Sequence, residues 1–198
     1  MGTLKTTNIQ TITGSGTLTL GTSGETLALG SGVTVSGNGL VGITMADQWR
    51  LNTDLSFSTS ETPISANLER VDTTGQGTLG TGMTESSGVF SFPSTGIYLV
   101  ASHFVFFKNG DTRFITNAIE VTTNNSTYTR VALTYGNLNA FDSNNIYTMS
   151  TTSSLVDVTD TSNVKVRFIQ RQQGTGATLD GSGSQNNTHF TFIRLGDT

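Results

Sequence analysis

The sequence predicts an all-β protein, built as an antiparallel sandwich, and three observations support this prediction. Only 12% of the residues are charged, the chain holds 23 Gly, and Thr, Ser and Asn are abundant, a composition that favours short strands joined by tight turns. No segment shows the periodicity of an amphipathic helix. Apolar and polar residues instead alternate in short segments between turn residues, as is typical of a sandwich. With 198 residues, the chain is long enough for one ordinary domain and an appendage.

Residues 1–45 differ from the rest of the chain, because they contain tiny apolar pairs separated by Gly, Ser and Thr. Each pair lies on one face of a short predicted strand, and the pairs are Leu18 and Leu20, Leu27 and Leu29, and Val33 and Val35. One copy of such a segment buries too little apolar surface to offset its loss of chain entropy. We therefore expect several copies to intertwine as a short β shaft with these six residues as its core. A flexible Gly/Ser/Thr linker is the alternative.

The main domain is expected at residues 46–198, with Met45 to Arg50 as the join. Trp49, Leu51 and Leu55 open its first strand at a spacing of two residues. A short strand around residues 66–71 and a Gly-rich connection precede the stretch from Gly88 to Phe107.

The strand that follows Pro93 and Gly96 organises the domain, because both of its faces are apolar. One face carries Tyr98, Val100, Phe104 and Phe106, and the other carries Ile97, Leu99, Ala101, Val105 and Phe107. A single sandwich interior covers only one face of a sheet. We therefore expect a second copy of the chain to cover the other face.

Later strands are predicted at residues 113–122, 127–135, 146–158, 163–170 and 188–195. The last two alternate most regularly, with Val164, Val166 and Phe168 facing inward in one and Phe190 and Phe192 in the other. Asn109-Gly110 predicts a tight hairpin turn. The small polar residues 174–187 predict a long loop.

Seven positions form a pattern that identifies a family, namely Gly88, Phe90, Phe92, Pro93, Gly96, Tyr98 and Val100. The pattern resembles the centre of the globular head of complement component 1q and its tumour necrosis factor relatives, and the closing strand THFTFIRLGDT resembles their last strand. This resemblance implies a jelly roll of about ten strands, a homotrimer with its central strands near the threefold axis, and binding rather than catalysis. On this basis we expect the trimer interface and core to contain Phe90, Phe92, Tyr98, Val100, Phe104, Phe106, Phe107, Phe190 and Phe192.

The segment NIQTITGSGTLTLGTSGETLALGSGVTVSG resembles the shafts of tailed-phage fibres and appendages. This resemblance implies a virion structural protein that adheres to a host surface or decorates the particle. It also implies that the N-terminal segment contacts other virion proteins and that the head binds a host polysaccharide or protein. The first residues lack a signal-peptide core, so we expect synthesis in the host cytoplasm. The alternative is a secreted or surface-displayed cellular binding module of the same fold.

Composition and motifs exclude several classes of function. A net charge of -4 provides no basic field for nucleic acid, and no apolar run is long enough for membrane insertion. The chain has no Cys, and its two His, His103 and His189, lie in predicted strands and are expected to pack or to line an interface. We expect no catalytic residue. A carbohydrate-processing enzyme is the competing class, and it would require two opposed carboxylates in a groove.

Two weaker candidates for binding sites remain. Calcium is a weak candidate ion, with Asp157 and Asp160 at a strand end and Asp142 and Asp180 in loops, and solvated turn carboxylates are the favoured interpretation. We otherwise expect no cofactor. Four aromatic residues could provide a contact surface for carbohydrate or protein, with trimer packing or core as the alternatives, namely Tyr128, Tyr135, Phe141 and Tyr147.

Overall fold

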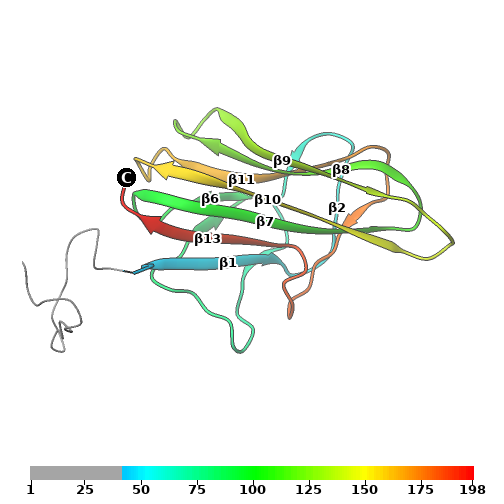
Figure 1. Ribbon diagram of the computed structural model, residues 1–198, viewed down its shortest axis with the longest axis horizontal. Coiled ribbons are helices and arrows are strands. Elements are labelled where there is room, and N and C mark those ends of the chain that lie inside the picture. Colours follow the sequence, from blue (N-terminus) through cyan, green and yellow to red (C-terminus); the bar gives the residue numbers. More distant parts are fainter. Residues whose placement is uncertain (1–41) are drawn as a thin grey trace, which may run out of the picture. The chain divides into compact units, whose positions relative to one another are not determined.

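The computed structural model describes residues 42–198, which form two antiparallel β-sheets packed face to face (Figure 1). This arrangement confirms the predicted all-β sandwich. The predicted shaft core, Leu18, Leu20, Leu27, Leu29, Val33 and Val35, lies outside the described residues. Within residues 42–198, no helix has the length and apolar character needed to cross a membrane.

Sheet A has the long strand β7 at its centre, with β10 on one side and β13, β1 and β4 in order on the other. The short strand β12 pairs with the end of β7 and carries β2. The strands of sheet A are β1 (Met45–Leu51), β2 (Leu55–Ser56), β4 (Leu68–Arg70), β7 (Gly96–Lys108), β10 (Ile146–Val158), β12 (Thr178–Leu179) and β13 (His189–Gly196). All pairings in the sheet are antiparallel.

Sheet B runs in the order β5, β6, β11, β8 and β9, and β3 pairs with β11. Its strands are β3 (Thr62–Pro63), β5 (Thr84–Ser86), β6 (Val89–Ser91), β8 (Thr112–Thr122), β9 (Tyr128–Leu138) and β11 (Lys165–Gln172). The strands predicted at residues 113–122, 127–135, 146–158, 163–170 and 188–195 correspond to β8, β9, β10, β11 and β13, with ends that differ by at most a few residues.

The turn between β6 and β7 passes the chain from sheet B to sheet A. Gly96 has a φ of 139°, and a Cβ atom there would lie 2.4 Å from the carbonyl oxygen of Gly196. Only glycine fits both the backbone angle and this close approach. The stretch predicted to organise the domain therefore provides one strand to each sheet.

Aromatic rings fill the centre of the sandwich around Phe90 of β6. Its ring centroid lies 5.5 Å from that of Trp49, 5.6 Å from that of Phe168 and 5.1 Å from that of Phe192. Phe168 and Phe190 add a further contact between the sheets at 4.3 Å. Rings at these distances bury much apolar area and gain from tilted and edge-to-face geometry, so this cluster joins the two sheets.

A polar cluster also joins the sheets within the interior. Asn117 of β8 accepts a hydrogen bond from the hydroxyl of Ser102 on β7 (2.7 Å) and donates one to the carbonyl of Ser150 on β10 (2.8 Å). The Ser150 hydroxyl lies 2.5 Å from that of Thr134 on β9. Because buried amides and hydroxyls are costly without partners, this cluster fixes which residues of β7 and β10 face inward.

Strand β1 begins at Met45, so the residues expected to form a join are part of the sheet instead. The cause is Asp47, a buried carboxylate at an inward position where the alternation would place an apolar residue. It accepts a hydrogen bond from the backbone N–H of Met83 (2.7 Å) and pairs with Arg70 (3.2 Å).

The segment expected to be a long loop, residues 174–187, contains the short strand β12, whose Leu179 is buried.

We predict that Phe90→Ala destabilises the fold by about 3–5 kcal/mol, because it leaves a cavity in the aromatic cluster. Phe141→Ala is the matched control, since this Phe is 93% exposed and its removal should change stability by less than about 0.5 kcal/mol. Chemical denaturation at one fixed protein concentration measures both changes. Equal losses for the two variants would contradict the packing described above.

Candidate functional site

The outward face of β7, β10 and β13 is an apolar surface on the side of sheet A that faces away from sheet B. We call it the β7–β10–β13 face, and Figure 1 shows its three strands side by side. Its large side chains include Tyr147, Met149 and Leu155 of β10, which are 61%, 69% and 64% exposed. Large apolar side chains exposed together on one face of a sheet favour an interaction surface.

Strand register brings these residues into rows across the sheet. Leu155 of β10 lies opposite Leu99 of β7, which lies opposite Ile193 of β13. A second row pairs Tyr147 with Phe107, whose ring centroids are 5.5 Å apart. Two rows that are more polar, Ser153–Ala101–Thr191 and Thr151–His103–His189, lie between them, so the face holds two apolar groups separated by a polar band.

Two histidines lie in the middle of this face. His103 of β7 and His189 of β13 are direct cross-strand partners, and their rings stack with centroids 5.1 Å apart. Nδ1 of His189 donates to the carbonyl of Asn186 (3.0 Å), and Nδ1 of His103 is 2.7 Å from the hydroxyl of Thr151. Partial burial lowers the pKa of His103 below its ordinary value, and the like charge of a protonated His189 lowers it further.

The structure divides the residues expected at the trimer interface and core into two groups. Phe107 alone lies on the outward face. The others are buried in the sandwich interior of a single chain, namely Phe90, Phe92, Tyr98, Val100, Phe104, Phe106, Phe190 and Phe192.

The sequence analysis missed three residues of the face, Met149, Leu155 and Ile193. The sequence of β10 did contain a signal for two of them, because the apolar residues at 147, 149 and 155 are separated by even numbers of residues and so lie on one face of the strand. This signal was overlooked because several intervening positions of β10 are Ser or Thr, which are not typical of residues that face a core. The inward Ser150 is buried all the same, because the polar cluster around Asn117 satisfies it.

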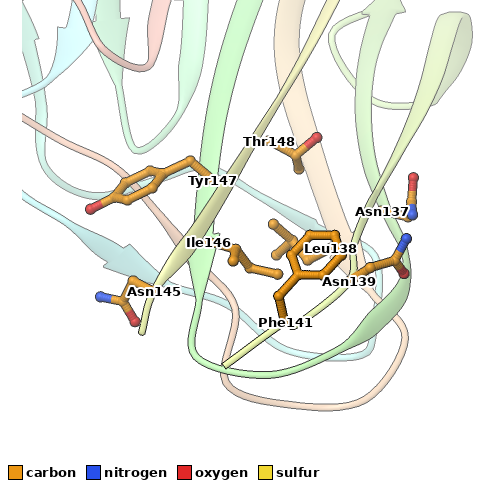
Figure 2. A pocket seen from close by; sticks show the side chains of 8 residues that line it. All are labelled: Asn137, Leu138, Asn139, Phe141, Asn145, Ile146, Tyr147 and Thr148. Atoms are coloured by element: carbon orange, nitrogen blue, oxygen red, sulfur yellow. The ribbon is translucent and has the colours of Figure 1, made fainter. Parts of the chain in front are cut away.

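A hollow of about 350 Å³ lies where β9 ends and β10 begins. Figure 2 shows Ile146 on the same side of β10 as Leu138 and Phe141, with Tyr147 on the other side. The hollow is lined by the uncharged residues Asn137, Leu138, Asn139, Phe141, Asn145, Ile146, Tyr147 and Thr148. A second hollow of about 250 Å³ lies beside Gln170 and is likewise lined without a carboxylate.

The four aromatic residues expected to form a contact surface are not brought together. Tyr147 and Phe141 border the hollow. Tyr128 instead lies under the guanidinium of Arg167 at 3.8 Å, and Tyr135 meets the ring of Phe114 at 6.1 Å.

The expected calcium ligands lie in different local settings. Asp160 accepts hydrogen bonds from the backbone N–H of Ser162 (2.7 Å) and the amide of Asn163 (2.6 Å), and these bonds lower its pKa. Asp157 lies exposed on β10, Asp142 accepts a bond from the N–H of Asn144, and Asp180 accepts one from Asn187. In the described part of the chain, no three His, Asp or Glu side chains gather as metal ligands would. Calcium binding stays a prediction.

Comparison with known proteins finds relatives at the level of fold. No protein-family model and no curated protein matches the chain. The crystal structure of murine APRIL at pH 5.0 matches with 14% identity over 76% of this chain and 98% of that chain, at a TM-score of 0.55. The structure of Eiger TNF from S. frugiperda matches with 13% identity over 79% of this chain and 95% of that chain, also at 0.55.

The fold is a tumour necrosis factor-like jelly roll. This finding confirms the jelly roll inferred from the segment Gly88 to Val100. At identities of 13% and 14%, the likeness concerns the fold alone.

We predict that His103 titrates below the ordinary histidine pKa of about 6.5. The folded protein favours the neutral form of His103, so protonation of this residue opposes folding. The stability that His103 contributes above about pH 6.5 is therefore lost as the pH falls through its lowered pKa. Histidine proton shifts followed by NMR against pH measure the value directly. His189→Gln should move it part of the way back towards 6.5, and a wild-type pKa at or above 6.5 would contradict the stacked, half-buried arrangement.

Proposed function

We propose that this chain is a non-enzymatic binding module that assembles as a homotrimer through the β7–β10–β13 face. The observation that carries the proposal is the presence of two apolar groups on the outward side of sheet A, the row Leu155–Leu99–Ile193 and the group formed by Met149, Tyr147 and Phe107. Leaving this surface in water is unfavourable by roughly 25 cal/mol per Å² of apolar area. Copies that cover it for one another remove that cost.

Both the position of the face in the fold and the resemblance seen in the sequence favour an assembly of three copies. The face is formed by β7, the strand at the centre of sheet A, and by its two neighbours. The resemblance of the Gly88 to Val100 segment to the complement component 1q and tumour necrosis factor families implies that these central strands approach a threefold axis. A closed ring of three buries the same patch on every copy and leaves none of it open.

We further propose that the trimer is the knob of a virion fibre or appendage. The support is the resemblance of residues 1–45 to phage shaft segments, and we expect that part to contact other virion proteins. Labelling of virus particles with an antibody against the knob tests this, and we expect label on spikes with threefold symmetry. Particles that lack the label, with the protein found on a cell surface instead, would favour the cellular binding module.

We predict that Leu155→Glu weakens self-association by about tenfold or more, because each interface would then bury an unpaired charge. Val131→Glu is the matched control, since Val131 is also an exposed apolar residue (46%) but lies on β9 of sheet B. Solution mass measured over a range of concentrations reports the change. A wild-type chain that stays folded and single at micromolar concentration would overturn the proposed assembly.

A further inference from the structure

We propose that the hollow between β9 and β10 binds a neutral saccharide, with Phe141 as the stacking ring and Asn137, Asn139 and Asn145 as hydrogen-bonding groups. This proposal names the ligand class of the binding function proposed above and rests on it. It is carried by four features of this corner of the sandwich: its apolar floor, its exposed amides, its exposed ring and its lack of charge.

The floor of the hollow is apolar and packs against the core. Leu138 ends β9 and is buried, and Ile146 opens β10 and packs against the core. The volume of about 350 Å³ lies within the range of small-molecule sites, which combine apolar walls with a few polar groups.

The amides of this corner divide into two kinds. Those of Asn109 and Asn144 are engaged within the protein, the first with the Ser143 carbonyl and the second with the Asp142 carboxylate (3.0 Å). The three asparagines that line the hollow are exposed, so their amides face solvent and are accessible to a ligand. A side-chain amide both donates and accepts, which matches the hydroxyl groups of a sugar, each of which does the same.

Phe141 is exposed on a loop whose backbone is hydrogen-bonded on both sides of this residue. The N–H of Ala140 donates to the carboxylate of Asp111 (2.6 Å), and Asn109 of the same turn holds the carbonyl of Ser143. The Phe141 ring itself remains 93% exposed. Bonds to the backbone on either side of Phe141 reduce the backbone entropy that is lost when a ligand binds, and the exposed face of the ring can cover the apolar side of a pyranose.

The absence of charge selects among sugars. No Lys, Arg, Asp or Glu lines the hollow. Lys108 of the adjacent turn donates to the Asp111 carbonyl (2.8 Å) and the Thr112 hydroxyl (3.2 Å). Acidic sugars are recognised through charge-assisted bonds from Arg or Lys, so this site favours neutral ones.

The test uses the full chain on an array of neutral glucans, mannans and galactans together with sialylated and uronic-acid glycans. We expect saturable binding to at least one neutral glycan. Phe141→Ala should weaken it by about tenfold or more, and Asn139→Ala or Asn145→Ala should weaken it several-fold. Tyr135→Ala is the matched control and should bind as the wild type does, because Tyr135 is 66% exposed on β9 outside the hollow.

Solution mass of the same samples separates this inference from the proposed assembly. A trimer that binds no neutral glycan, that binds only acidic ones, or that binds equally well after Phe141→Ala would overturn the saccharide site and leave the assembly standing. A single chain whose neutral-glycan binding depends on Phe141 would overturn the assembly and support the site.

Discussion

The register of β7 is the constraint on which the rest of the structure depends. Successive side chains of a strand point to opposite faces, so a single choice assigns every residue of β7 to the interior or to the outside. The aromatic cluster and the Ser102–Asn117 hydrogen bond both make that choice, because they require Phe104 and Ser102 to face inward. Leu99 and His103 must then face outward. The apolar outward face is therefore a consequence of the same packing that closes the sandwich.

Strand β10 shows the same constraint with a mixed inward face, where Val156 and Val158 belong to the core and Ser150 is also buried. Ser150 faces inward because Asn117 and Thr134 satisfy it, which leaves Met149 and Leu155 on the outside. At positions 149 and 150 alone, a strand that needed only to close a single-chain sandwich would gain from exchanging Met and Ser, since apolar burial is favourable and polar burial needs partners. The arrangement in β10 is favourable when something apolar covers its outer side. A second copy of the same face, as in the proposed trimer, would meet that need, because it presents the same rows of side chains.

The sequence predicted the parts of the fold in which alternation is undisturbed. Val164, Val166 and Phe168 lie in the interior as expected, and so do Phe190 and Phe192. Alternation failed as a guide where a buried polar residue takes an inward position, as Asp47 does in β1. The hollow could not be predicted, because its loop is held by Asp111 and Asn109, which lie about thirty residues earlier in the chain and whose bonds to Ala140 and Ser143 exist only in the fold.

The proposed assembly and the proposed saccharide site meet at the start of β10. Ile146 forms part of the floor of the hollow, and the next residue, Tyr147, belongs to the outward face and stacks near Phe107. Covering Tyr147 with another copy would restrict β10 on one side and thereby hold Ile146 in position on the other. A trimer would also present three such hollows together, and linked weak sites bind a repetitive polysaccharide far more tightly than one site alone. The same strand would thus link the stability of the knob to its affinity for a surface.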